Sequence, residues 1–304
     1  MNFKKILITG GAGFIGSHLV EHFQGIASEI IVLDNLRSGH LENLAGLDHT
    51  FVHGCVTDRA LVDSIMPGTD YVFHLAAMIS VPESMEKPIE CNHINVTGLL
   101  NVLESAANHG VKKLVLASSA AVYGDNPIVP KTEDMIPEPK SPYAITKLAG
   151  EYYLEMFRRE GRINTASLRF FNVFGPRQDP NSAYAAAVPI FAQKALSGEP
   201  ITIFGDGLQT RDFIFVKDVT AALAHAASTE NMHGTYNVGY GNSITINQLA
   251  QEIILLTGST SKITHAPSRP GDVKHSRANI DRLTNTGWKA STTLIEALAL
   301  TVQR

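Results

Sequence analysis

The stretch ITGGAGFIGSHLV, from Ile8 to Val20, joins an apolar run to a segment with helical periodicity. Its three glycines Gly10, Gly13 and Gly16 have the spacing GxxGxxG. The first permits a tight turn, the second lets a pyrophosphate approach the backbone, and the third lets the helix pack closely on the strand. The pattern predicts a turn that holds a dinucleotide at a helix N-terminus, where free N–H groups favour negative charge.

An acidic residue ends the next apolar run, EIIVLD, at Asp34. A carboxylate at this position accepts hydrogen bonds from the adenosine ribose and repels a 2′-phosphate, so NAD is favoured over NADP. Arg37 leaves NADP open as an alternative. A glycine turn that binds nothing is the competing interpretation, and the strand before the turn and the helix after it argue against that.

Apolar runs alternate with helical segments through the first half of the chain. We predict strands at residues 4–10, 29–34, 70–77, 112–120 and 164–171, and helices at residues 17–24, 97–108 and 143–159. This alternation predicts an α/β fold with a Rossmann-type doubly wound parallel sheet that is covered on both faces. We expect residues 1–171 to form the NAD-binding domain, with a segment of about residues 208–240 returning to it. Residues 172–304 form a smaller mixed α/β domain that binds the substrate.

The composition is that of a soluble globular protein, with 44% hydrophobic and 18% charged residues in 304. The net charge of −4 points to no nucleic-acid or membrane partner. No apolar run reaches membrane-spanning length, and the first strand is expected from Phe3, so we expect no signal peptide and a cytoplasmic location. Only Cys55 and Cys91 are present, and HExxH and CxxC are absent, so neither a disulfide framework nor a metal site is predicted.

A tyrosine and a lysine lie four residues apart in SPYAITKLAG, at Tyr143 and Lys147. On a helix they share a face, and the plainest interpretation is a surface pair that stabilises the helix slightly. Ser118 and Ser119 end a predicted strand and therefore lie on the ligand side of the sheet. A nearby ammonium and a positive nicotinamide ring favour the phenolate. Together with the dinucleotide loop, the set predicts general acid–base catalysis by the tyrosine.

The chain resembles the extended short-chain dehydrogenase/reductase superfamily, and within it the NAD-dependent UDP-hexose 4-epimerases. The matching elements run along nearly the whole chain: TGGAGFIG, VLDNLRSG, HLAA, NVTG, SSAAVYG, YAITK, LRFFNVFGPRQ, TRDFIFVKDV and RPGDVKHSRANI. The resemblance implies that the C-terminal part binds a nucleotide sugar, and that Tyr143 takes the proton of the 4-hydroxyl while hydride passes from C4 to NAD. The 4-keto sugar then rotates, and hydride returns to its other face.

The resemblance also implies roles for individual residues. Lys147 would bind the nicotinamide ribose and lower the pKa of Tyr143, and Ser119 would bind the 4-oxygen. Positions near the cofactor, besides those already named, fall on Phe14, Ile15, Asn35, Ser38, Gly39, Val56, Leu75, Ala76, Ala77, Asn95 and Phe170. Positions near the UDP-sugar, besides Ser118, Ser119 and Tyr143, fall on Asn172, Ala187, Val188, Phe204, Arg211, Ile244, Arg269, Asp272 and Ser276. A homodimer built through a four-helix bundle of residues 97–108 and 143–159 is implied as well.

Two features narrow the expected reaction. Ala120 and Ala121 follow Ser119 where related 4,6-dehydratases and UDP-glucuronate decarboxylases carry an acid, so simple oxidation and re-reduction is favoured. Ser276 stands where the family controls room for the sugar 2-substituent, and a small residue favours N-acetylhexosamines as well as glucose and galactose. The alternative is that Ser276 is an ordinary polar residue.

Two departures from the family pattern bear on the cofactor. Cys55 and Val56 replace an acid that binds adenine, so adenine must be held through the backbone, through Asp58 or less tightly. Some relatives carry a lysine that contacts the cofactor phosphate after the HLAA segment; here that lysine is absent, and Ile79 stands near its position.

The alternatives to the 4-epimerase are a UDP-glucuronate 4-epimerase, a nucleotide-sugar reductase, and a dinucleotide-sensing protein without catalysis.

Overall fold

The computed structural model describes residues 3–180, 186–268 and 273–303, which group into two compact units. Unit 1 comprises Met1–Val122, Pro139–Phe170 and Val219–Tyr236, and unit 2 comprises Tyr123–Glu138, Phe171–Asp218 and Asn237–Arg304. The division at Phe170 lies one residue from the predicted boundary. The returning segment is shorter than residues 208–240, and the loop Tyr123–Glu138 groups with unit 2, which the sequence pattern did not indicate.

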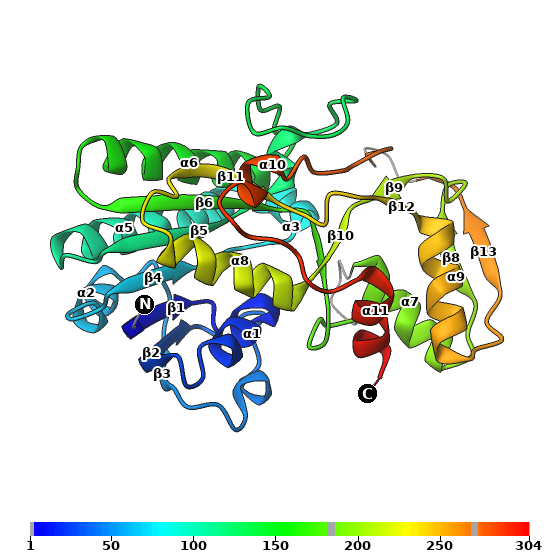
Figure 1. Ribbon diagram of the computed structural model, residues 1–304, viewed down its shortest axis with the longest axis horizontal. Helices are drawn as coiled ribbons and strands as arrows, with labels where there is room; N and C mark the ends of the chain where they lie inside the picture. Colours follow the sequence, from blue (N-terminus) through cyan, green and yellow to red (C-terminus); the bar gives the residue numbers. More distant parts are fainter. Residues whose placement is uncertain (1–2, 181–185, 269–272, 304) are drawn as a thin grey trace. The chain divides into compact units, whose positions relative to one another are not determined.

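A seven-stranded sheet forms the framework of unit 1 (Figure 1). Its strands, in spatial order, are β11 (Gly234–Val238), β6 (Asn164–Phe170), β5 (Lys113–Ser119), β4 (Tyr71–His74), β1 (Phe3–Thr9), β2 (Ala27–Asp34) and β3 (Thr50–His53). All pairings from β6 to β3 are parallel. The carboxyl ends of these strands therefore meet at one edge of the sheet, with β1 lying between β4 and β2.

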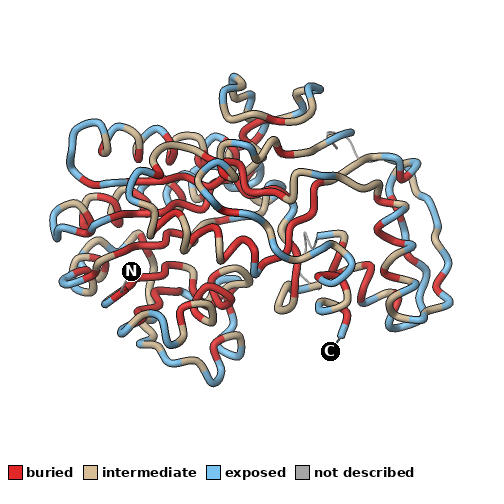
Figure 2. The backbone as a smooth tube through the Cα atoms, in the orientation of Figure 1, coloured by how far each residue is buried: buried red, intermediate tan, exposed pale blue. Residues whose placement is uncertain are grey.

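Helices cover the sheet on both faces, which confirms the predicted fold class. They are α1 (Phe14–His22), α2 (Arg59–Ile65), α3 (Val81–Glu86), α4 (Pro88–Asn92), α5 (Gly98–Asn108), α6 (Pro142–Arg159) and α8 (Val216–Ser228), with the one-turn π-helix η2 (His93–Thr97) joining α4 to α5. Residues of α2, α5 and α6 form one apolar cluster with alternate strand residues such as Leu7. Ile6 and Ile8 point to the opposite face and are also fully buried. Figure 2 shows this sheet as mostly buried chain.

The predicted strands and helices of the first half all occur, with ends that differ by a few residues. The pattern missed β3, because this edge strand is short and none of its four residues is fully buried. It also missed α3 and α4, whose lengths of 6 and 5 residues are too short to establish a helical period.

Unit 2 is built from short elements in separate two-stranded sheets. Its elements are β7 (Asn172–Phe174), α7 (Ala187–Leu196), β8 (Ile201–Phe204), β9 (Thr210–Arg211), β10 (Phe213–Phe215), β12 (Ile244–Thr245), α9 (Ile246–Thr257), β13 (Ile263–Ala266), α10 (Asp281–Thr284) and α11 (Leu294–Val302). Strand β10 pairs with β7, β12 with β9, and β13 with β8. Strands β8 and β10 lie close together in the sequence but in different sheets, because each pairs with a distant segment.

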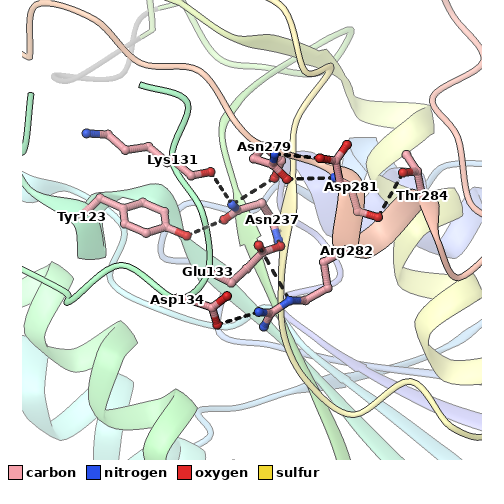
Figure 3. A network of polar contacts seen from close by, with 9 residues as sticks. All are labelled: Tyr123, Lys131, Glu133, Asp134, Asn237, Asn279, Asp281, Arg282 and Thr284. Carbon is pink, nitrogen blue, oxygen red and sulfur yellow. Dashed lines mark hydrogen bonds and ion pairs between the residues drawn. The ribbon is translucent and has the colours of Figure 1, made fainter. Parts of the chain in front are cut away.

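A buried asparagine ties three segments of unit 2 together (Figure 3). The side chain of Asn237 accepts a hydrogen bond from the Tyr123 hydroxyl at 2.7 Å and donates to the carbonyls of Lys131 and Asn279 at 2.9 and 3.2 Å. Its backbone N–H donates to Glu133 at 2.8 Å. With its side-chain amide and backbone N–H paired, Asn237 anchors the loop Tyr123–Glu138.

Candidate active site

The turn after β1 has the close contacts that its glycines predict. Gly10 has a φ of 73°, and a β-carbon on it would lie 2.8 Å from the backbone nitrogen of Ala76. A β-carbon on Gly16 would lie 2.1 Å from the Gly10 carbonyl oxygen. Helix α1 begins after Gly13, and no side chain of the described residues caps its N-terminus. Backbone N–H groups are thus presented in a cradle without side chains, which fits the pyrophosphate of a dinucleotide.

Asp34 ends β2 and is buried beside this turn. Its carboxylate accepts hydrogen bonds from the Ala12 N–H at 3.0 Å and the Leu36 N–H at 2.8 Å. These bonds hold the glycine turn and the next loop in fixed positions, and the remaining lone pairs can accept from a ribose hydroxyl. Leu36 has a φ of 58°, a conformation that side chains rarely adopt, so the loop turns sharply there.

Arg37 follows on the same loop and is bound by two acids. Its guanidinium donates to Glu83 on α3 at 2.7 Å and to Glu90 on α4. Lys87 also lies 3.4 Å from Glu83. A guanidinium that is already paired with two carboxylates is a poor partner for a 2′-phosphate, and this geometry favours NAD over NADP.

The remaining cofactor positions surround the same edge of the sheet. Phe14 and Ile15 begin α1, Gly39 packs on Ala12, and Phe170 ends β6. Asn35 and Ser38 are exposed on the loop after β2, and Leu75, Ala76 and Ala77 follow β4. Val56 is buried against Gly98, and its carbonyl accepts a hydrogen bond from Asn101 at 3.0 Å. Asp58 caps α2 through the Leu61 N–H, so its carboxylate already has a structural partner.

Asn95, which was expected to contact the cofactor, has a side chain that is hydrogen-bonded within the protein. Its side chain accepts a hydrogen bond from the Met78 N–H at 2.7 Å and donates to the Met78 carbonyl and to Thr146 at 3.0 and 2.9 Å. Because Met78 follows the HLAA segment and Thr146 lies on α6, Asn95 joins the cofactor-side loop to the helix that carries Tyr143.

Helix α6 begins just before Tyr143. Ser141 caps it by accepting from the Ala144 N–H at 3.2 Å, and Pro142 occupies the first turn, where it needs no hydrogen-bond partner. The Tyr143 N–H donates to the Ser84 hydroxyl on α3 at 3.2 Å. The phenol therefore starts from a backbone position that is fixed from both sides.

The phenol of Tyr143 and the ammonium of Lys147 lie together. The Lys147 nitrogen is 5.7 Å from the centre of the Tyr143 ring and donates to the Ala117 carbonyl at 2.8 Å. Burial lowers the pKa of Lys147 to about 8. Burial raises the pKa of Tyr143 above its usual value, and a hydrogen bond with Ser119 opposes that rise. In the protein without cofactor, burial is thus the largest cause of the shift in the Tyr143 pKa, and its direction is upward.

The two serines at the end of β5 face different partners. Ser119 lies beside Tyr143, and its hydroxyl also accepts from the Ala121 N–H at 3.1 Å. Ser118 is buried and donates to Glu151 on α6 at 2.5 Å. The hydroxyl of Ser118, which was expected to contact the substrate, is thus engaged by Glu151 within the protein.

Three buried residues near the lysine were missed in the sequence. Glu151 lies one turn after Lys147 and accepts two hydrogen bonds from the guanidinium of Arg169 on β6, at 2.9 and 2.7 Å. Continuing the four-residue spacing from Tyr143 through Lys147 would have found Glu151. Nothing in the local pattern singled out Arg169, or His74, whose ring is 2.9 Å from the Thr9 hydroxyl and whose pKa burial lowers to about 3.

A pocket of about 310 Å³ lies within unit 2. It is lined by Asn172, Val173, Phe174, Ala186, Ala187, Val188, Ile190, Phe191, Thr202, Ile203, Phe204, Gln209, Arg211, Phe213 and Ile246. Five predicted substrate residues are among these: Asn172, Ala187, Val188, Phe204 and Arg211. The N-terminus of α7 and a guanidinium thus meet an apolar, aromatic wall, an arrangement that suits an anionic group joined to a flat ring.

Ile244 and Ser276 lie outside this lining but beside the same strand. Ile244 pairs with Arg211 across β12 and β9, and the Ser276 N–H donates to the Thr210 carbonyl at 3.1 Å. Arg269 and Asp272 lie outside the described residues. Asp212, which follows β9, accepts from the N–H groups of Ala278, Tyr240 and Gly241 at 2.8–3.1 Å. It therefore holds the segment of Ser276 next to Arg211.

Neither a metal cluster nor a membrane-spanning helix occurs in the described ranges 3–180, 186–268 and 273–303. Within them, no group of three or more histidine, cysteine or acidic residues is arranged to hold a metal ion. Nor does any helix there have both the length and the apolar character needed to cross a membrane.

Comparison with known proteins agrees with this geometry. The model of the NAD dependent epimerase/dehydratase family matches residues 6–239. A UDP-glucose 4-epimerase of Mycolicibacterium smegmatis is 37% identical over 98% of this chain and 97% of its own length.

Two solved structures are similar over the whole chain. The UDP-N-acetylglucosamine 4-epimerase of Methanobrevibacter ruminantium, in complex with UDP-N-acetylmuramic acid, has a TM-score of 0.96 and 40% identity, covering 100% of this chain and 98% of its own. The UDP-glucose 4-epimerase of Thermus thermophilus, in complex with NAD, has a TM-score of 0.88 and 38% identity, covering 98% of this chain and 97% of its own.

Proposed function

The chain belongs to the NAD dependent epimerase/dehydratase family, and from that premise we propose that it inverts C4 of UDP-hexoses. The membership confirms the expected family, the enzyme class and NAD as the cofactor. The observation that carries the proposed reaction is the grouping of Ser119, Tyr143 and Lys147 at the sheet edge that also holds the glycine cradle.

The proposed chemistry divides between the cofactor and the side chains. NAD, when bound, supplies a reversible acceptor for the C4 hydride. Tyr143 accepts the proton of the 4-hydroxyl and later returns it to the 4-keto oxygen. Ser119 donates a hydrogen bond to that oxygen, and the Lys147 ammonium stabilises the phenolate. Since hydride and proton leave and return to the same sugar, no net redox change occurs.

The segment after Ser119 supports simple inversion over elimination. Ala120 and Ala121 provide no carboxylate there, so nothing in that segment takes a proton from C5 or assists loss of carbon dioxide. Dehydratase and decarboxylase chemistry both need such a group, and the proposed reaction does not.

A UDP-sugar is the proposed substrate because of the chemistry of the unit 2 pocket. Arg211 and the N-terminus of α7 suit a diphosphate, and the aromatic wall suits a base. Small Ser276 beside Arg211 leaves room for a 2-acetamido group, so we propose that UDP-GlcNAc and UDP-GalNAc are accepted along with UDP-Glc and UDP-Gal. The sugars in the names of the similar epimerases are consistent with both groups.

We also propose a homodimer through α4 to α6. Ile145, Tyr152 and Met156 recur on one face of α6 and are 41–63% exposed. Ile89 on α4 is 86% exposed. The exposed apolar stripe on α6, together with Ile89, supports burial against a second copy in a four-helix bundle. The cytoplasmic location inferred from composition stays a prediction.

A panel of UDP-sugars tests the proposal. The purified protein is incubated with each sugar without added cofactor, and inversion at C4 is scored by NMR. An epimerase turns over with its bound NAD, whereas a reductase consumes added NAD(P)H in proportion to product. Inversion of UDP-glucuronate alone would identify the UDP-glucuronate 4-epimerase instead, and a dinucleotide sensor would invert none.

A further inference from the structure

Three consecutive residues at the end of β5 each contact a different residue on one face of α6. The pairs are Ala117 with Lys147, Ser118 with Glu151, and Ser119 with Tyr143. The helix residues are spaced by four, so each pair adds one helical turn to the contact. The strand that carries the candidate serine is therefore fixed to the helix that carries the phenol over two turns.

The middle pair belongs to a buried network. Glu151 accepts from the Ser118 hydroxyl at 2.5 Å and pairs with Arg169 through two hydrogen bonds of 2.9 and 2.7 Å. The side chains of Glu151 and Arg169 are only 4% and 5% exposed. A buried bidentate ion pair between a carboxylate and a guanidinium fixes the distance between the two groups and their relative orientation, because both groups are planar. The network thus joins α6 to both β5 and β6.

We propose that Glu151 is a positioning residue for the Tyr143–Lys147 pair: through Ser118 it fixes α6 against β5, and its charge keeps Lys147 protonated. The kinetic part of this inference rests on the proposed epimerase function. The ionisation of Lys147 depends only on the protein and is measurable without turnover.

Two neighbours, Cys91 and Glu151, oppose the effect of burial on the pKa of Lys147. The ammonium is faced by His74 from β4, by Cys91 from α4, and by Tyr143 and Glu151 from its own helix. His74 is neutral because burial lowers its pKa to about 3, and burial raises the pKa of the Cys91 thiol. Arg169 is paired with Glu151, so loss of the carboxylate would also leave an unopposed positive charge.

Two variants separate the mechanical and the electrostatic parts. Ser118→Ala removes the bond to β5 but leaves the buried ion pair intact, and Glu151→Gln removes the charge. Thr165→Val is the matched control, because Thr165 on β6 donates a buried hydrogen bond of 3.0 Å to Leu154 on the same helix, away from the network. All three are compared with the wild type by steady-state kinetics and by NMR titration of ¹³Cε-labelled lysine, with Lys147 assigned from Lys147→Arg.

Ser118→Ala is expected to lower kcat about tenfold or more with unchanged KM, because the Tyr143 phenol is then no longer held in its position relative to Ser119. In Glu151→Gln the titration midpoint of Lys147 is expected to fall by about half a pH unit or more below its wild-type value, and the basic limb of kcat follows it. Thr165→Val should leave both readouts unchanged.

The proposal is overturned if Ser118→Ala turns over within about twofold of the wild type, or if Lys147 titrates at the same pH in Glu151→Gln. Should Glu151→Gln not fold, the kcat of Ser118→Ala still decides the mechanical part. Should the wild type invert no UDP-hexose, the proposed function fails, while the Lys147 titration still decides the electrostatic part.

Discussion

The ammonium of Lys147 lies one helical turn from Tyr143 and 5.7 Å from the centre of its ring. The same nitrogen donates to the Ala117 carbonyl, so its position is set by β5 as well as by α6. A fixed cation therefore lies beside a phenol whose pKa burial raises. The phenol remains a proton donor at neutral pH in the protein alone, and a further positive charge, such as an oxidised nicotinamide ring, is needed to make it a base.

Replacing Tyr143 by Phe should lower kcat for C4 inversion about 10²- to 10⁴-fold, since the proton acceptor is lost. Binding of NAD and of the UDP-sugar, measured by calorimetry, should change little because the ring is retained. Tyr153→Phe, a hydroxyl loss on the same helix, is the control. Unchanged activity of Tyr143→Phe would rule out the proposed role.

Replacing Lys147 by Met should abolish turnover and yet stabilise the fold at neutral pH. Burial depresses the pKa of Lys147 from 10.5 to about 8, so its folded state carries a penalty that is fully present below pH 8. That penalty is lost as pH rises from about 8 towards 10.5, because the unfolded chain then binds more protons.

The penalty amounts to about 3 kcal/mol at 1.36 kcal/mol per pKa unit, less about 1 kcal/mol for the lost bond to Ala117. Urea unfolding at pH 7 should therefore show Lys147→Met about 2 kcal/mol more stable than the wild type, with a smaller difference at pH 9.5. A variant less stable at pH 7 would contradict the assigned ionisation.

Arg37 should slow the release of NAD. It joins the loop after β2 to α3 and α4, which follow β4, and β1 with its glycine turn lies between those strands. A dinucleotide that passes from Asp34 over the turn towards Tyr143 must cross the region spanned by these ion pairs. Arg37→Ala should speed displacement of bound etheno-NAD about three- to tenfold, and high salt should speed it only in the wild type.

Arg59→Ala is the matched control for Arg37, because Arg59 also joins two acids, Asp63 and Glu104, but between α2 and α5. It should leave NAD release unchanged. Equal release rates for Arg37→Ala and the wild type at low salt would show that the ion pairs do not retain the cofactor.

Enlarging Ser276 should narrow the range of sugars. Its N–H donates to the carbonyl of Thr210, which precedes the pocket residue Arg211. Ser276→Tyr should therefore lower kcat/KM for UDP-GlcNAc about tenfold and for UDP-Glc less than threefold, by loss of space for the acetamido group. Ser197→Tyr, exposed at the end of α7, serves as the control. An equal loss for both sugars would remove Ser276 as a determinant of specificity.

The sheet and its ligand edge could be predicted because each signal is local. Gly10 approaches the backbone of Ala76 and Gly16 approaches the carbonyl of Gly10 too closely for a β-carbon. Each position therefore requires a glycine, which is visible in the sequence. Asp34 follows the apolar run of residues 30–33, and Tyr143 follows a proline at a helix start. These residues are readable because short-range geometry decides them.

Residues that act through distant partners could not be predicted in the same way. Ser118 differs from Ser119 in its partner, Glu151, which is 33 residues away in the chain. Asn95 looked like a cofactor contact, yet its amide is occupied by Met78 and Thr146. Long-range pairing also decided the strands of unit 2, where β8 and β10 join different sheets.

The central claim is a reversible inversion at C4 that uses bound NAD and the Tyr143 phenol. Its most direct test is NMR of UDP-Glc, UDP-Gal, UDP-GlcNAc and UDP-GalNAc incubated with purified protein without added cofactor. The account predicts that each pair approaches the same equilibrium mixture from either epimer and that Tyr143→Phe does so about 10²- to 10⁴-fold more slowly. No inversion of any UDP-hexose by the NAD-loaded wild type would contradict it.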